Sequence, residues 1–218
     1  MIPFIDLGAQ QARIRDRIDR GIAAVLDHGA YIMGPEVTAI ETRLAEAAST
    51  RHCISCSSGT DALILALLAH GLRPGQGVIV PSFTFAASAE VMPVLGAVPV
   101  FAEVDAATFN LDPSRLDDAL QAGREADIEI VGIIGVGLFG QPADYNAIQA
   151  FASEHGMWVI DDAAQSFGAA LNNVPVGRLA ETTCTSFFPA KPLGCYGDGG
   201  AVFTDDDEKA EIMRSCRI

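Results

Sequence analysis

Positive charge is scarce in this sequence. Its 218 residues include 14 lysines and arginines against 28 aspartates and glutamates, which gives a net charge of −14 at pH 7. Such a chain repels nucleic acids and anionic lipids, whose binding depends on basic side chains. We therefore expect no nucleic-acid partner and no membrane partner. Only two basic residues are lysines, Lys191 and Lys209, so each of them is informative.

Long apolar runs and regular cysteine spacings are also missing. No run of about 18 uncharged apolar residues could span a bilayer, and the N-terminus lacks a basic region followed by an apolar block. The five cysteines are an odd number, which is typical of reduced thiols. Cys53 and Cys56 have zinc spacing, but no second pair completes a site, so no metal is expected. These absences favour a cytoplasmic protein.

Apolar residues make up half of the chain and occur in short runs that alternate with helical segments. Uncharged strands that alternate with helices are typical of a mostly parallel sheet with helices on both faces, so we predict an α/β fold. Helices are expected at residues 10–28, 35–48, 60–70, 86–95, 143–155 and 205–214. Strands are expected at residues 53–55, 78–80, 98–102, 128–136, 157–160, 184–188 and 201–204, with a hairpin after residue 169.

Two units are predicted, an N-terminal helical segment at residues 1–30 and a large domain at residues 31–218. Only 19% of the residues are charged. Part of the surface is therefore expected to be covered by another subunit or by a missing part of the chain. The last helix reaches the C-terminus without a glycine or proline stop signal, so we expect a cut end.

A first candidate for chemistry is the segment Ser57-Ser58-Gly59-Thr60-Asp61, which lies between a strand and a helix. Small residues and free N–H groups at a helix N-terminus can hold a phosphate. The same residue types are also the preferred helix caps. Taken alone, the segment favours an ordinary cap over a phosphate site.

Two further candidates are a carboxylate and a lysine. Asp161 and Asp162 follow an apolar strand, and ligands of open α/β sheets bind at the carboxyl ends of strands. Lys191 is the only charged residue between positions 182 and 197. Such apolar surroundings suit an amine that reacts with an aldehyde. Lys209, among four acidic residues, is typical of a solvated helix start. A phosphate site, a carboxylate at a strand end and a lysine in apolar surroundings are together the groups that binding of pyridoxal phosphate requires.

At this point the sequence resembles the sugar-nucleotide aminotransferases of the DegT/DnrJ/EryC1/StrS family, from Phe4 to the last residue. The segments that carry the resemblance are Gly34-Pro35-Glu36-Val37, Ser58-Gly59-Thr60-Asp61-Ala62-Leu63, Pro81-Ser82-Phe83-Thr84-Phe85, Gly140-Gln141-Pro142-Ala143-Asp144, Asp162-Ala163-Ala164-Gln165-Ser166-Phe167-Gly168 and Thr185-Ser186-Phe187-Phe188-Pro189-Ala190-Lys191-Pro192-Leu193-Gly194. The resemblance implies the large domain of a fold type I enzyme that depends on pyridoxal phosphate.

The resemblance also implies roles for individual residues around the cofactor. Lys191 is expected to form the Schiff base with the aldehyde and later to move a proton. Asp162 is expected to pair with the pyridinium, and Gln165 to lie near the phenolic oxygen of the ring. Asp161 departs from the glutamate that is usual in the family, but the cofactor-facing position is the next residue.

The remaining implied contacts involve the phosphate and the ring face. Gly59, Thr60 and Ser186 are expected to hold the phosphate. Phe85 is expected to stack on the ring, although taken alone it is typical of a core residue.

The function that the resemblance implies is transamination of a keto sugar nucleotide with glutamate as the amino donor. The segments most resemble the branch that acts on UDP-2-acetamido-2-deoxy-3-oxo-glucuronate in O-antigen synthesis. The resemblance implies a homodimer for the complete protein, and we expect the smaller C-terminal domain of the family, which contributes substrate contacts, to be missing from this chain. Two alternatives stay open. The substrate is another keto sugar nucleotide or a cyclitol ketone, or the chain is a truncated, non-catalytic module that only binds.

Overall fold

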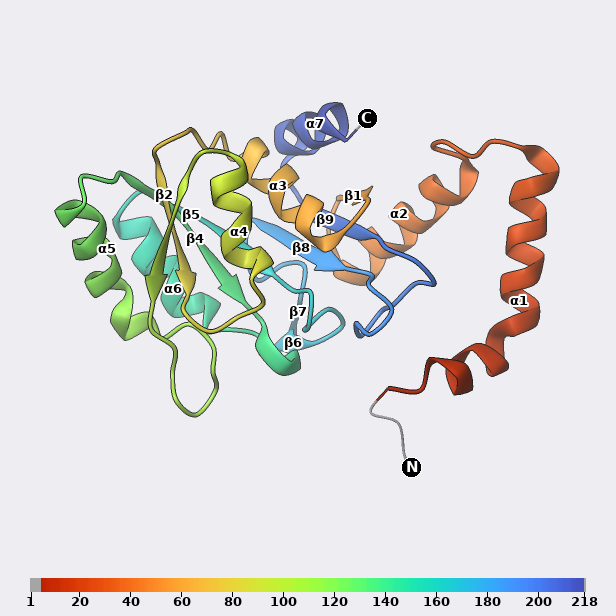
Figure 1. The fold of residues 1–218 in the computed structure, drawn as a ribbon, viewed down its shortest axis with the longest axis horizontal. Coiled ribbons are helices and arrows are strands. Elements are labelled where there is room, and N and C mark those ends of the chain that lie inside the picture. Colours follow the sequence, from red (N-terminus) through yellow and green to blue (C-terminus); the bar gives the residue numbers. More distant parts are fainter. Residues whose placement is uncertain (1–4, 218) are drawn as a thin grey trace.

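The computed structural model describes residues 5–217. The predicted N-terminal segment therefore includes four residues outside the described range, Phe4 among them, and Ile218 of the predicted large domain also lies outside it. A seven-stranded sheet in the order β1-β9-β8-β5-β4-β2-β3 forms the centre (Figure 1). Its strands are β1 (His52–Cys56), β2 (Gly77–Pro81), β3 (Val98–Ala102), β4 (Ile130–Val136), β5 (Trp158–Asp162), β8 (Thr182–Ser186) and β9 (Gly200–Thr204).

The sheet is mostly parallel. The neighbours β8, β5, β4, β2 and β3 pair in parallel, whereas β9 is antiparallel to both β8 and β1. The predicted hairpin is present as the short pair β6 (Ala170–Leu171) and β7 (Val174–Pro175). The structure thus confirms the predicted α/β class with a mostly parallel sheet.

Helices cover both faces of this sheet (Figure 1). The helices are α1 (Leu7–His28), α2 (Pro35–Ala48), α3 (Gly59–Ala69), α4 (Ala87–Val94), α5 (Leu116–Glu125), α6 (Tyr145–Glu154) and α7 (Asp207–Cys216), with short 3-10 turns η1 (Pro113–Arg115) and η2 (Leu138–Gly140). In β2, Val78 and Val80 belong to the apolar cluster that includes residues of α3, α4 and α7, whereas Ile79 belongs to the cluster that includes residues of α5 and α6. This alternation follows from the strand period of two, and it buries the strand on both faces.

Two elements differ from the sequence prediction. Helix α5 was not predicted, because Gly123 interrupts its pattern. A Cβ at Gly123 would lie 2.8 Å from Ile130, so close packing against β4 accounts for the glycine. Strand β8 ends at Ser186 rather than continuing through two phenylalanines. The chain leaves the strand at Phe187, whose N–H donates to the carbonyl of Gly199.

Helix α1 lies away from the sheet (Figure 1). Asp6 caps its first turn and Gly29 ends it with a φ of 69°, as a left-handed C-cap does. None of its residues is buried, so the apolar stripe that predicted the helix packs on no core. The division at residue 30 stays a prediction. Within residues 5–217, no helix is both long enough and apolar enough to cross a membrane.

Candidate active site

A cavity of about 720 Å³ lies at the carboxyl ends of the central strands. Val136 at the end of β4, Asp162 at the end of β5 and Ser186 at the end of β8 all contribute to its wall. The structure brings together here every site residue that the sequence predicted, namely Gly59, Thr60, Phe85, Asp162, Gln165, Ser186 and Lys191. Residues more than 130 positions apart thus share one cavity, where the general rule for open α/β sheets places a ligand.

The N-terminus of α3 forms one end of the cavity. Ser58 is the N-cap, and its hydroxyl accepts the N–H of Asp61 at 3.0 Å. The cap interpretation is therefore confirmed for Ser58. In the described part of the chain, the N–H groups of Gly59 and Thr60 have no hydrogen-bond acceptor. The helix begins with open donors and the positive end of its dipole facing the cavity.

Gly59 also lies against the end of β8. A Cβ at this position would lie 2.6 Å from the Cβ of Ser186, which is too close for any side chain. The glycine therefore lets the helix start and the Ser186 hydroxyl converge. Hydroxyl and N–H donors side by side at a helix N-terminus are the groups that bind phosphate.

Asp162 is the buried carboxylate of the cavity. Its Oδ2 accepts the hydroxyl of Ser88 at 2.7 Å, and its Oδ1 accepts the N–H of Ala164 at 3.2 Å. Burial raises the pKa of Asp162, while the hydrogen bonds from Ser88 and Ala164 and the charge of Lys191 oppose that rise. Because a buried ionised carboxylate needs a cation, the site suits a positively charged ligand atom.

Asp161, the neighbouring carboxylate, lies on the other face of β5 and is completely buried. Its two oxygens accept the hydroxyls of Tyr145 and Thr183. Burial raises the pKa of Asp161 to about 7, against the effect of these hydrogen bonds. Asp161 is therefore part of the core under α6, and only Asp162 contributes to the cavity.

Lys191 lies in a loop that folds back on itself after β8. The backbone N–H of Lys191 donates to the carbonyl of Phe188, and the backbone N–H of Cys195 donates to the carbonyl of Phe187. The ammonium lies 5.8 Å from the centre of the Phe85 ring, within reach of a cation–π interaction. The side chain is only half-buried, because apolar neighbours such as Phe188 and Leu193 are themselves exposed.

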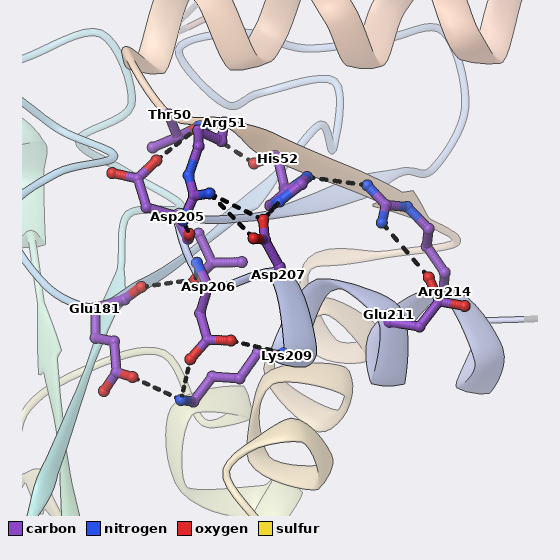
Figure 2. Close-up of polar contacts among 11 residues, drawn as sticks. Thr50, Arg51, His52, Glu181, Asp205, Asp206, Asp207, Lys209, Glu211 and Arg214 are labelled. Atoms are coloured by element: carbon purple, nitrogen blue, oxygen red, sulfur yellow. Dashed lines mark hydrogen bonds and ion pairs between the residues drawn. The ribbon is translucent and has the colours of Figure 1, made fainter.

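Lys209 is the contrasting lysine. Its ammonium donates to Glu181 at 2.6 Å and to Asp206 at 2.8 Å (Figure 2). The same cluster joins α7 to the start of β1, where Arg51 and His52 both pair with Asp207 (Figure 2). Arg51, Glu181, Asp206 and Asp207 from these pairs line a second cavity of about 600 Å³. Lys209 therefore balances two carboxylates near the start of α7, and its ammonium is already engaged.

Gln165 and Phe139 also line the cavity. The Oε1 of Gln165 accepts the N–H of Phe139 at 3.0 Å. Phe139 has a φ of 56°, in the left-handed region that a non-glycine residue rarely adopts. Its ring is 71% exposed at the cavity, as is 66% of Phe85. Two aromatic faces thus stay open to a ligand or to another chain.

Ser88, Thr84 and Phe139 are site residues that sequence reasoning missed. Ser88 falls within the apolar pattern of α4 and Thr84 within a loop, so neither is distinguished by residue type. A serine on the buried face of an apolar helix was the only available signal, because buried hydroxyls require a partner. The left-handed backbone of Phe139 has no sequence signal at all.

These residues fit the parts of pyridoxal phosphate. Open donors at Gly59, Thr60 and Ser186 suit the phosphate, and a Cβ at residue 59 would fill that space. The buried carboxylate of Asp162 suits a protonated ring nitrogen, and the exposed ring of Phe85 suits stacking. Within residues 5–217, no group of three or more histidine, cysteine or acidic side chains is arranged to hold a metal ion.

Comparison with known proteins gives one consistent result. The sequence matches the DegT/DnrJ/EryC1/StrS aminotransferase family over residues 12–218. It is 54% identical to the UDP-2-acetamido-2-deoxy-3-oxo-D-glucuronate aminotransferase of Pseudomonas aeruginosa over 98% of this chain. The match covers 58% of that protein, so the chain spans little more than half of its relative's length.

Solved structures agree with the sequence match. The crystal structure of a DegT/DnrJ/EryC1/StrS aminotransferase from Brucella abortus superposes with a TM-score of 0.95 at 49% identity, covering 99% of this chain and 58% of that one. NtdA from Bacillus subtilis, solved with the bound cofactor PMP, has a TM-score of 0.83 at 32% identity, with 91% and 43% of the two chains covered. These neighbours confirm the predicted fold type.

Proposed function

This chain belongs to the DegT/DnrJ/EryC1/StrS aminotransferase family, and from that premise we propose that its cavity binds pyridoxal phosphate and serves transamination of a keto sugar nucleotide. The observation that carries the proposal is the convergence of open phosphate donors, one buried carboxylate and one unengaged lysine on a single cavity. A family neighbour with bound PMP supports the choice of cofactor.

Pyridoxal phosphate, when bound, supplies an aldehyde that joins to an amine and a ring that withdraws electrons from the adjacent carbon. The chain's own residues do the rest. Gly59, Thr60 and Ser186 would hold the phosphate, and Phe85 would stack on the ring. Asp162 would keep a positive charge on the ring nitrogen through a charge-assisted hydrogen bond.

Lys191 has two tasks at its Nζ atom. As a neutral amine it would hold the cofactor aldehyde, and after the amino donor has taken its place it would carry a proton from the donor carbon to the cofactor carbon on the far side of the shared nitrogen. A half-buried side chain that lines the cavity suits both tasks, because its amine can be reached from the cavity. Gln165, which lines the cavity, would contact the ring near its phenolic oxygen.

We further propose a UDP-linked keto sugar, with glutamate as the donor and O-antigen or related polysaccharide synthesis as the setting. The 54% identity to the Pseudomonas aeruginosa enzyme supports the sugar. A homodimer is proposed because the aromatic side chains at the cavity are exposed. A cytoplasmic location is proposed because all five cysteines are free thiols.

The test is a half-reaction. The chain is loaded with pyridoxal phosphate and mixed with glutamate without a keto sugar. We expect 2-oxoglutarate in an amount equal to the bound cofactor, and none from Lys191→Arg. Lys209→Arg is the matched control and should behave as the unchanged chain. Adding a UDP-linked 3-keto sugar or a 4-keto-6-deoxy sugar then identifies the acceptor. Absence of 2-oxoglutarate from loaded, folded chain would contradict the proposal.

A further inference from the structure

One buried serine joins two walls of the cavity. Ser88 lies in the first turn of α4 and has no exposed surface. Its hydroxyl donates to Oδ2 of Asp162 at 2.7 Å, while its N–H donates to the carbonyl of Phe85 at 3.1 Å. From behind the wall, this residue therefore fixes both the carboxylate and the backbone that carries the exposed aromatic ring.

The Asp162 carboxylate determines which hydroxyl donates and which accepts in the series Thr84, Ser88, Asp162. Thr84 Oγ1 lies 3.1 Å from Ser88 Oγ. An ionised carboxylate only accepts hydrogen bonds, so Ser88 gives its single proton to Asp162. The Ser88 oxygen is then free to accept the proton of Thr84. Both hydroxyls point toward the carboxylate, an arrangement that favours its ionised form.

Four titratable groups lie close enough to Asp162 to affect its charge, and two of them, Asp161 and Tyr145, lie on the opposite face of β5. Lys191, from the loop after β8, favours a negative charge on Asp162. Asp161 on β5, Tyr145 on α6 and Cys184 on β8 disfavour it when they are ionised. Burial raises the pKa of both Tyr145 and Cys184 well above their usual values, so these two stay neutral near pH 7.

We propose that Ser88 is a positioning residue that holds Asp162 ionised and correctly oriented. Thr84 supports it by donating a hydrogen bond to the Ser88 hydroxyl. The effect is present before any ligand binds, because both hydrogen bonds join groups of the protein itself. The inference rests on the proposed function in one respect, since an ionised Asp162 matters for the reaction only if a cationic ring binds beside it.

The experiment is a titration of Asp162 in the chain without cofactor. Aspartate labelled with ¹³C at the carboxyl group is followed by NMR, and the Asp162 signal is identified by its loss in Asp162→Asn. A hydrogen bond to a charged group contributes about 1.5 to 3 kcal/mol, so Ser88→Ala should raise the Asp162 midpoint by about one pH unit or more. Ser88→Thr keeps the hydroxyl and should restore the unchanged value, while Thr84→Val should give a smaller rise.

A matched control is Thr182→Val. Thr182 is fully buried in the same sheet, but its hydroxyl pairs with His70 at 2.9 Å, away from the cavity. It should leave the Asp162 midpoint unchanged. In chain loaded with pyridoxal phosphate, the loss of affinity on the acid side should move to higher pH in Ser88→Ala by the same amount.

An unchanged Asp162 midpoint in folded Ser88→Ala would overturn the inference. If Ser88→Ala does not fold, an unchanged midpoint in Thr84→Val would overturn it instead, and a rise there would support it. Failure of the unchanged chain to bind pyridoxal phosphate would contradict the proposed function. It would leave the titration, which needs no cofactor, as a valid test of Ser88.

Discussion

At the scale of single residues, two adjacent carboxylates have different surroundings because successive residues of a strand face opposite sides. Asp162 accepts from Ser88 and borders the cavity, whereas Asp161 accepts from Tyr145 and is completely enclosed. The sequence indicated which of the two faces a ligand only through family resemblance. The hydroxyl partners could not be predicted, because they lie on other elements, Ser88 on α4, Tyr145 on α6 and Thr183 on β8.

Asp162→Asn should therefore weaken binding of pyridoxal phosphate about 10- to 100-fold, since a charge-assisted hydrogen bond of about 1.5 to 3 kcal/mol is lost. The folded state should persist. Fluorescence titration with the cofactor measures the change, and Asp161→Asn is the control. If Asp161→Asn were the damaging substitution and Asp162→Asn silent, the assignment would be wrong by one residue.

Asp161 should instead be visible in the pH dependence of stability. Its pKa rises from an unfolded value near 4 to about 7 on folding. A raised carboxyl pKa means that the folded state holds the proton more tightly, so stability falls as pH rises between these two values. From pH 4 to pH 7, the unfolding free energy of the unchanged chain should therefore fall relative to that of Asp161→Asn. Urea unfolding at several pH values measures it, and a difference independent of pH would contradict the burial argument.

At the scale of elements, the sequence predicted most helices and strands because the spacing of apolar residues agrees with the glycine and proline residues that mark the ends of elements. Pro35 begins α2, Gly29 ends α1, and the apolar triplet Val78-Ile79-Val80 forms the centre of β2. The prediction was wrong for two elements whose presence or length depends on contacts with other parts of the fold. Helix α5 tolerates Gly123 because Ile130 of β4 lies against it, and β8 ends at Ser186 because its partner strand β9 begins opposite, at Gly200.

The junction between α3 and β8 gives a prediction at this scale. Gly59→Ala places a Cβ 2.6 Å from Ser186, so the first turn of the helix must move away from the strand end. Destabilisation of about 1 to 3 kcal/mol is expected, together with weaker binding of the cofactor phosphate. Denaturant unfolding and cofactor titration measure the two effects.

Gly21→Ala in α1 is the matched control for that substitution. Nothing lies within 4 Å of a Cβ at Gly21, which is in a regular exposed helix. Alanine there should be neutral or stabilising by up to about 1 kcal/mol. Equal effects of the two alanines would show that the close approach at Gly59 has no consequence.

At the scale of the whole molecule, a strongly acidic chain carries exposed aromatic side chains beside its cavity. Phe83, Phe109 and Phe139 form a chain of ring contacts, with centroids 5.7 and 6.1 Å apart. All three rings are exposed, and two of the residues have a positive φ. An aromatic surface of this kind is typical of an interface, whereas the net charge of −14 opposes association.

We therefore expect the chain to self-associate, more strongly at high salt because salt screens the repulsion between negative copies. Phe139→Ser should weaken association. Val94→Ser, which removes an exposed apolar residue at the end of α4, should not. Sedimentation velocity at two salt concentrations measures this. A monomer at every concentration and salt level would contradict the proposed dimer.

The central claim is that the cavity around Lys191 binds pyridoxal phosphate through that residue's amine. The chain has only two lysines, so a single labelling experiment separates the alternatives. Folded chain is incubated with the cofactor, reduced with borohydride to make the attachment permanent, digested and analysed by mass spectrometry. The account predicts the cofactor mass on the peptide that contains Lys191. A label on Lys209, or no label on folded chain with excess cofactor, would contradict it.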